Sequence, residues 1–279
     1  MPLSYEEIIS HESQGNPAEG LRRLVLRGSV AATARPGQFL HVRVSDRLEP
    51  LLRRPLSIAS IDRTRGEVTL LYRVRGRGTE TLARKRSGER LDVLGPLGNG
   101  FSIPEKGELW LVAGGIGIFP LYALARAGLA AGLKVHLFWG GESRNFLQSA
   151  GLAEWQDLGI PLHLSTMDGS LGDKGTVMLP LGKAEDPRSA ANRLSGQPLP
   201  ALSVAVCGPR GMMQAVAELG SARGWRVEVS LEERMACGVG ACLGCSVTVR
   251  DERGRLTNRK VCQDGPVFPG KEVVWNGAR

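Results

Sequence analysis

The chain has 279 residues, of which 42% are hydrophobic and 23% are charged. This length predicts about two domains with room for a small third unit, and the composition excludes disordered and fibrous proteins. The net charge of +8 is uneven, because eleven Lys or Arg and only four Asp or Glu lie between Arg53 and Arg90. Such a basic region fits a phosphate-bearing ligand or an acidic partner. Aromatic and basic residues are not interleaved as in a base-stacking groove, so we expect no nucleic acid partner.

The cysteine usage and the apolar runs indicate the cellular compartment of the protein. The N-terminal segment carries Glu6 and Glu7 without a basic stretch, which does not fit a signal peptide. The longest uncharged run, Leu109 to Ala125, is shorter than the roughly 20 apolar residues that span a bilayer. Four of the five cysteines cluster between Cys237 and Cys262, which favours metal or redox ligation over secreted disulfides. We therefore expect a cytoplasmic protein with no membrane association.

The N-terminal third predicts an antiparallel sheet. Apolar residues alternate with polar ones over residues 40–44 and 68–74, and glycine-rich turns separate these segments. Such alternation is typical of half-buried strands. The turn-forming segment 95–100 predicts a domain edge, so we expect a β-barrel over residues 1–104.

From Glu108 the pattern changes to strands that alternate with helices. The predicted strands cover residues 109–113, 135–139, 162–165, 204–207 and 227–230, and the predicted helices cover 121–131, 146–158 and 212–223. This order indicates parallel β-α-β units. We expect an α/β nucleotide-binding domain over residues 105–231, with a surface insertion at 183–200.

The last segment, residues 232–279, contains the strongest motif. Its cysteines have the spacing C-x4-C-x2-C-x16-C, which is the plant-type ferredoxin pattern for a 2Fe–2S cluster. The alternative is a zinc knuckle, which favours two C-x2-C pairs, whereas this segment has one. A unit this small also needs a metal or cluster for stability. The predicted cluster ligands are Cys237, Cys242, Cys245 and Cys262.

Three segments of the predicted barrel together indicate an anion site. They are Arg53-Arg54-Pro55-Leu56-Ser57, Leu71-Tyr72-Arg73, and Gly78-Thr79 before an expected short helix at 80–86. An arginine pair alone is most often surface charge. Beside amides at a helix N-terminus, however, an arginine fork suits a pyrophosphate.

Two glycine turns follow strands of the predicted parallel sheet. The first, residues 113–120, departs from G-x-G-x-x-G because Pro120 replaces the third glycine. It fits either close approach of a nucleotide or a tight connection without a ligand. The second is Cys207-Gly208-Pro209, and at this edge Cys207 is either a small core residue or part of a nicotinamide pocket.

These motifs carry a family resemblance. The motifs Arg-x-x-Ser, Gly-Gly-x-Gly-x-x-Pro and Cys-Gly-Pro, in this order, resemble the ferredoxin–NADP reductase superfamily. The cysteine loop and the tail at 261–268 narrow the resemblance to the electron transfer subunits of dihydroorotate dehydrogenase B, over essentially the whole chain. The resemblance implies three cofactors: FAD, a 2Fe–2S cluster and NAD.

The resemblance also implies roles for individual residues. Arg54 would contact the FAD pyrophosphate, Ser57 would lie near flavin N5, and Leu56 replaces a stacking tyrosine of many relatives. The remaining FAD residues would be Pro55, Leu71, Tyr72, Arg73, Gly78 and Thr79. Gly115, Gly117 and Cys207 would border NAD. Glu142 suits a ribose hydroxyl and Arg144 a 2′-phosphate, so NAD and NADP both stay open.

The implied function is electron transfer. An FMN-containing catalytic subunit would oxidise dihydroorotate in pyrimidine biosynthesis, and electrons would pass through the cluster and FAD to NAD, in a heterotetramer of two plus two subunits. One alternative is an NAD(P)H–ferredoxin type oxidoreductase subunit of another flavin–iron–sulfur complex. Another is a non-catalytic iron–sulfur sensor on an inactive reductase fold, which the intact Arg54, Ser57, Gly115 and Gly117 disfavour.

Overall fold

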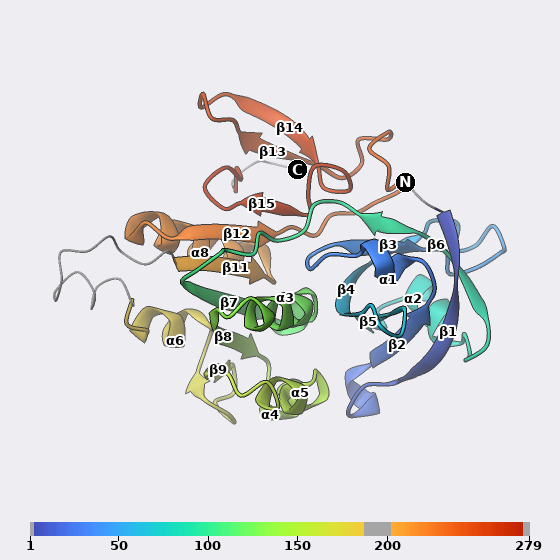
Figure 1. Ribbon diagram of the computed structural model, residues 1–279, viewed down its shortest axis with the longest axis horizontal. Helices are drawn as coiled ribbons and strands as arrows, with labels where there is room; N and C mark the ends of the chain where they lie inside the picture. Colours follow the sequence, from blue (N-terminus) through green and yellow to red (C-terminus); the bar gives the residue numbers. More distant parts are fainter. Residues whose placement is uncertain (1–2, 187–201, 276–279) are drawn as a thin grey trace.

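The computed structural model describes residues 3–186 and 202–275. It has a barrel, a mixed sheet covered by helices, and a small C-terminal unit that lies above both (Figure 1). The predicted β-barrel, α/β domain and small C-terminal unit are confirmed. Most of the predicted insertion at 183–200 lies outside the described residues.

Six antiparallel strands close the barrel in the order β1-β2-β5-β4-β3-β6. The strands are β1 (Leu3–Ser13), β2 (Leu21–Arg27), β3 (Phe39–Val42), β4 (Arg54–Asp62), β5 (Glu67–Arg73) and β6 (Arg90–Leu97). Alternate residues such as Leu24, Leu40, Val42 and Ile58 fill the interior, as the period of two requires. Strand β1 precedes the segment in which the sequence indicates alternation.

Short helices lie in the connections between strands of the barrel. They are η1 (Pro17–Glu19), α1 (Val30–Thr33) and α2 (Arg77–Ala83). Helix α2 begins three residues before the expected helix at 80–86, so Gly78 and Thr79 lie within its first turn. The Thr79 hydroxyl accepts from the amides of Arg75 and Gly76 and therefore anchors this early start.

The second domain is built on a seven-stranded sheet in the order β10-β9-β8-β7-β11-β12-β15. The first six strands are parallel: β10 (Asp173–Lys174), β9 (Leu162–Thr166), β8 (Lys134–Gly141), β7 (Glu108–Gly114), β11 (Leu202–Cys207) and β12 (Arg226–Ser230). The chain leaves β7 toward β8 and later returns to its other side at β11. The topological switch point, where ligands bind in open α/β sheets, therefore lies between β7 and β11.

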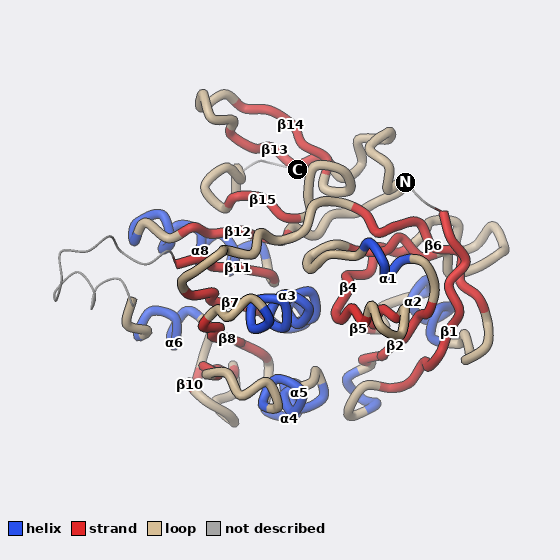
Figure 2. The backbone as a smooth tube through the Cα atoms, viewed as in Figure 1, coloured by secondary structure: helices blue, strands red, loops and turns tan. Residues whose placement is uncertain are grey.

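Helices cover both faces of this sheet (Figure 2). One face packs on α3 (Phe119–Ala130), α4 (Arg144–Ser149) and α5 (Leu152–Gln156), and the other on α6 (Met178–Lys183) and α8 (Arg210–Arg223). Along β7, Leu109 and Leu111 point to the first face and Trp110 and Val112 to the second. The single helix expected at 146–158 is instead two helices, because Gly151 takes a left-handed φ of 103°.

The C-terminal unit consists of the cysteine loop, a two-stranded sheet and a return to the main sheet. Strands β13 (Ser246–Arg250) and β14 (Leu256–Lys260) pair with each other, while β15 (Val267–Pro269) pairs antiparallel with β12. The sheet of the second domain is therefore mixed at its edge. The Asn99 side chain donates to Asp264 O (3.0 Å), so the turn after the barrel also contacts this unit. Among the described residues, no helix is long and apolar enough to cross a membrane.

Candidate functional site

Two cavities lie next to each other where the barrel meets the switch point of the sheet. The first, about 390 Å³, is lined by the barrel strands β3, β4 and β5, the turn before α3 and the segment after β12. The second, about 540 Å³, is lined by the glycine turns after β7 and β11. They share Arg73, Ile116, Leu231 and Glu232, so a ligand in one can touch a ligand in the other.

The first cavity brings together most of the residues predicted to bind FAD. Seven of the nine line it: Pro55, Leu56, Ser57, Leu71, Tyr72, Arg73 and Thr79. The barrel strands supply these side chains from one rim, and the volume suits part of a flat aromatic ring system. The individual contacts to FAD stay predictions.

The other two residues predicted to bind FAD, Arg54 and Gly78, contact each other. A Cβ added to Gly78 would lie 2.1 Å from Arg54 Nε and 2.3 Å from Nη2. Only glycine leaves room for the guanidinium against the first turn of α2. The Arg54 guanidinium therefore lies against the first turn of α2, and its Nη1 donates to the carbonyl groups of Leu52 and Arg53. The contact of Arg54 with a pyrophosphate stays a prediction.

The Tyr72 hydroxyl is hydrogen-bonded to His11, a residue that the sequence analysis did not indicate. His11 Nε2 lies 2.8 Å from the Tyr72 hydroxyl, and Nδ1 lies 2.9 Å from Lys85 O. A carbonyl can only accept, so Nδ1 carries the proton, and Nε2 of the neutral ring accepts from Tyr72. Burial lowers the pKa of His11 and favours this neutral form.

The second cavity is built on close backbone approach. A Cβ at Gly117 would lie 2.2 Å from the Cys207 carbonyl oxygen, so the turn after β7 packs directly on the end of β11. Gly115 has a left-handed φ of 55° and no atom within 4 Å of an added Cβ, which leaves open space for a ligand. Both glycines line the cavity, as does Glu142. Arg144 instead donates to Ser170 O and is not among the lining residues.

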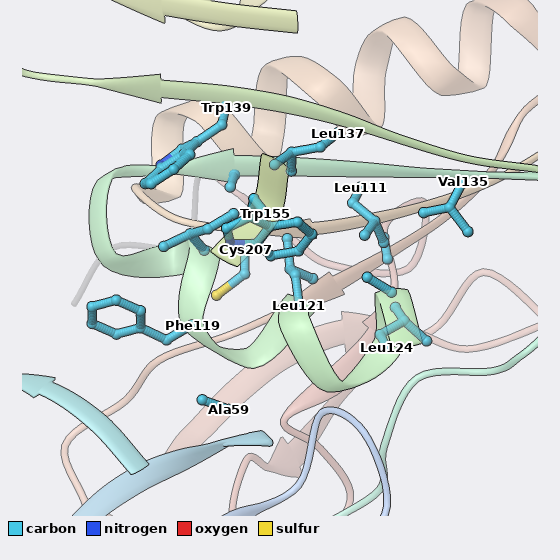
Figure 3. Close-up of a cluster of buried hydrophobic side chains, with 14 of the residues drawn as sticks. Ala59, Leu111, Phe119, Leu121, Leu124, Val135, Leu137, Trp139, Trp155 and Cys207 are labelled. Atoms are coloured by element: carbon cyan, nitrogen blue, oxygen red, sulfur yellow. The ribbon is translucent and has the colours of Figure 1, made fainter. Parts of the chain in front are cut away.

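Cys207 lies at this edge but points into the core. Figure 3 shows its side chain in the hydrophobic cluster beside Phe119 and Leu121. Burial, with a smaller contribution from Glu232, raises the pKa of the thiol far above its usual range. Cys207 is not among the residues that line either cavity. Its predicted contact with nicotinamide stays a prediction.

Glu232 is a site residue that the sequence reading missed. It belongs to the lining of both cavities and is exposed there. The available signal was its position two residues after the end of β12, at the carboxyl edge of the parallel sheet. Acidic residues are so common on surfaces that this position alone did not distinguish it.

The four predicted cluster ligands share one small unit. Cys245 and Cys262 are buried, Cys242 is exposed and Cys237 is half-buried. Backbone amides point at the thiols: Val239 and Cys242 donate to Cys237 Sγ (both 3.4 Å), and Gly240 donates to Cys262 Sγ (3.2 Å). The amide hydrogen bonds, that from Val239 first, lower the pKa of Cys237 to about 6.

The loop backbone also fits a cluster. Gly238 has a left-handed φ of 71°, and a Cβ added there would lie 2.4 Å from His41 Nδ1. Gly240 has a left-handed φ of 79°, and a Cβ added there would lie 2.1 Å from Gln263 Oε1. Both positions therefore require glycine. Within the described ranges, no three His, Cys, Asp or Glu side chains are arranged to hold a single metal ion. The assignment of a two-iron cluster therefore rests on the cysteine spacing, the amides and the glycines.

Comparisons with known proteins identify the family. The C-terminal residues 232–274 match the iron–sulfur cluster binding domain of dihydroorotate dehydrogenase B, and residues 111–218 match the oxidoreductase NAD-binding domain. The electron transfer subunit of dihydroorotate dehydrogenase B (NAD(+)) from Desulforamulus reducens is 39% identical, with 88% of this chain and 89% of that protein covered. The Bacillus cereus (strain G9842) subunit is 38% identical, with 94% and 96% covered.

The chain belongs to the family of dihydroorotate dehydrogenase B electron transfer subunits. It is an oxidoreductase component, and the predicted cofactor set of FAD, a 2Fe–2S cluster and NAD is confirmed. A solved NADH-dependent reduced ferredoxin–NADP oxidoreductase, described for flavin-based electron bifurcation, superposes with a TM-score of 0.78 at 30% identity over 98% of this chain and 91% of that chain. The ferredoxin reductase of carbazole 1,9a-dioxygenase shares the fold, with a TM-score of 0.62 at 22% identity over 82% and 69%.

Proposed function

We propose that this electron transfer subunit takes electrons from an FMN-containing subunit that oxidises dihydroorotate, and delivers them to NAD in pyrimidine biosynthesis. The continuity of its three predicted cofactor sites carries this proposal. The segment after β12 lines both cavities with Leu231 and Glu232, lines the first with Met235, and reaches the cluster ligand Cys237 two residues later. One stretch of chain therefore joins the nicotinamide, flavin and cluster sites.

When bound, the flavin exchanges single electrons with an iron–sulfur centre and hydride with a nicotinamide. The chain's own residues hold the cofactors in contact. Arg54 and the amides of α2 would hold the pyrophosphate of FAD, and Leu56 and Tyr72, which line the first cavity, would lie beside its ring. Ser57 lines the cavity on the same strand as Arg54 and is the candidate partner for flavin N5.

Arg73 ties the two domains together where the cavities meet. It donates to Glu19 Oε2 (2.9 Å) in the barrel and lies 3.5 Å from Glu142 Oε1 of the nucleotide-binding domain. Its guanidinium also lies over the Phe146 ring of α4. These contacts hold the barrel against the nucleotide-binding domain. Hydride transfer between two bound cofactors requires such a fixed arrangement.

The partner is proposed to dock over the cluster loop. Cys242 is exposed there, and Val239 and Leu243 beside it are 41% and 61% exposed. Exposed apolar side chains around a redox centre fit a protein interface, of roughly 800 Å² on each partner. The FMN in that partner, the heterotetramer of two plus two subunits and the cytoplasmic location are parts of this proposal.

NAD is the proposed nucleotide. Glu142 lines the second cavity and can accept from a ribose hydroxyl, whereas Arg144 is engaged with Ser170 away from the lining. An acidic residue that accepts from the ribose hydroxyl is typical of NAD sites in such sheets.

Activity of the purified chain tests this function. We expect the loaded subunit to oxidise NADH with artificial electron acceptors, and to leave dihydroorotate unreacted when no partner is present. The 30% identical oxidoreductase supports the alternative of a ferredoxin-linked reductase. Reduction of NAD from dihydroorotate by the chain alone would contradict the proposal. Rapid ferredoxin-dependent turnover together with no binding of a dihydroorotate-oxidising subunit would favour the alternative.

A further inference from the structure

His41 is a buried histidine with no hydrogen-bond partner. It lies on β3, its side chain is fully buried, and neither ring nitrogen has a partner within the described structure. Buried polar groups are almost always hydrogen-bonded, because an unpaired donor or acceptor loses its contact with water without compensation. The vacant donor of this ring therefore indicates a partner other than the protein groups around it.

The ring faces the cysteine loop. A Cβ added to Gly238 would lie 2.4 Å from His41 Nδ1 and 3.2 Å from Cε1, so the loop backbone is packed against the imidazole. Gly238 directly follows the predicted ligand Cys237. The backbone amides of Val239 and Cys242 in the same loop already donate to Cys237 Sγ. The ring therefore lies against the backbone of the loop that carries the predicted ligands Cys237 and Cys242.

The position along β3 places the ring between two cofactor sites. Phe39 lies two residues before His41, on the same face of the strand. It lines the first cavity, and it packs in the hydrophobic core that also contains Cys245 and Cys262. Pro55, which pairs with His41 across β3 and β4, lines the same cavity. His41 therefore lies beside both the flavin cavity and the cluster loop.

We propose that His41 donates its ring N–H to the sulfur atoms of the iron–sulfur cluster held by the Cys237–Cys242 loop, and so raises the reduction potential of the cluster. A reduced cluster carries one more negative charge than an oxidised one. A donor aimed at its sulfur stabilises the reduced form more, which makes reduction easier. His41 is a positioning residue that tunes the centre rather than a ligand, and this inference rests on the proposed function.

Isotope labelling tests the hydrogen bond in the unmodified protein. The chain has four histidines, and the other three lie on β1, β8 and β9. Protein grown with ¹⁵N-histidine, loaded with its cluster and reduced, should show a weak histidine nitrogen coupling in pulsed electron paramagnetic resonance spectra. His41→Gln should lose it and His163→Gln should keep it. A loaded wild-type protein without this coupling would overturn the inference and leave the proposed function standing.

Redox titration tests the effect on potential. At the wild-type midpoint, His41→Leu should hold about tenfold less reduced relative to oxidised cluster, equivalent to ~59 mV for one electron. His41→Gln, which keeps a donor, should recover part of this loss, and His163→Leu should match wild type. Unchanged potentials in both His41 variants at full iron and sulfide content would contradict the proposal. A wild-type chain that binds no cluster when iron and sulfide are supplied would overturn both the inference and the function.

Discussion

Arg54 is the single residue that we propose to hold the FAD pyrophosphate. Its guanidinium fills the space that Gly78 leaves open at the start of α2. Replacing it with glutamate exchanges a charge-assisted hydrogen bond for repulsion of the pyrophosphate. We expect Arg54→Glu to weaken FAD binding by at least about tenfold, or ~1.4 kcal/mol, in a fluorescence titration. Arg65→Glu, at an exposed turn of the same domain, is the control, and equal FAD affinity in both variants would contradict the site.

His11 predicts a pH dependence of stability. Burial, with a smaller contribution from Arg22, lowers its pKa from 6.5 in the folded chain. As the pH falls below about 6.5, the unfolded chain takes up a proton that folded His11 resists, so the free energy of unfolding decreases. His11→Gln should remove this part of the decrease while keeping an acceptor for Tyr72. Denaturant unfolding at neutral and mildly acidic pH measures it, and identical losses in wild type and variant would refute the assignment.

The cysteine loop is the element whose chemistry is most directly testable. Cys242 is an exposed member of the C-x4-C-x2-C motif, while Cys207 is a buried residue at the end of β11. We expect Cys242→Ser to lose the visible iron–sulfur absorption and Cys207→Ser to keep it. Iron and sulfide analysis of both proteins checks the result. Bleaching by Cys207→Ser but not by Cys242→Ser would mean that the ligand set is wrong.

Helices and strands with a regular apolar pattern could be predicted from the sequence. The exact points where helices begin or break could not. The β7 strand and its glycine turn follow directly from an apolar run ended by glycines. The break between α4 and α5 depends on one left-handed glycine, and the early start of α2 depends on the Thr79 hydroxyl. Such local hydrogen bonds and dihedral angles override the periodicity on which the prediction was based.

At the scale of the whole molecule, the sites are formed by contacts between segments far apart in the sequence. The motifs around Arg54, Gly117 and Cys237 were recognisable because each carries its own local pattern. Glu232 and His41 carry none, and their proximity to the cofactor sites appears only when β12 and β3 are brought together with the cysteine loop. Residues of this kind cannot be found without the fold.

The three units are joined by direct contacts between their elements. Strand β15 extends the nucleotide-binding sheet from within the C-terminal unit, and Asn99 and Asp264 link that unit to the turn after the barrel. Gln14, the residue after β1, donates its Nε2 to Glu154 Oε1 of α5 (3.2 Å) and so connects the barrel to the second domain. These contacts keep the predicted cofactor sites at fixed separations while the cluster loop stays exposed to a partner.

Reconstitution with the catalytic subunit tests the central claim most directly. The loaded chain is mixed with an FMN-containing dihydroorotate dehydrogenase subunit from the same organism, and NAD reduction is followed after addition of dihydroorotate. We predict that NADH forms only when both proteins are present, and that Cys242→Ser abolishes this activity without removing oxidation of NADH by artificial acceptors. Failure of the loaded chain to bind the catalytic subunit, or NADH formation at an undiminished rate with Cys242→Ser, would contradict an electron path through this subunit's cluster.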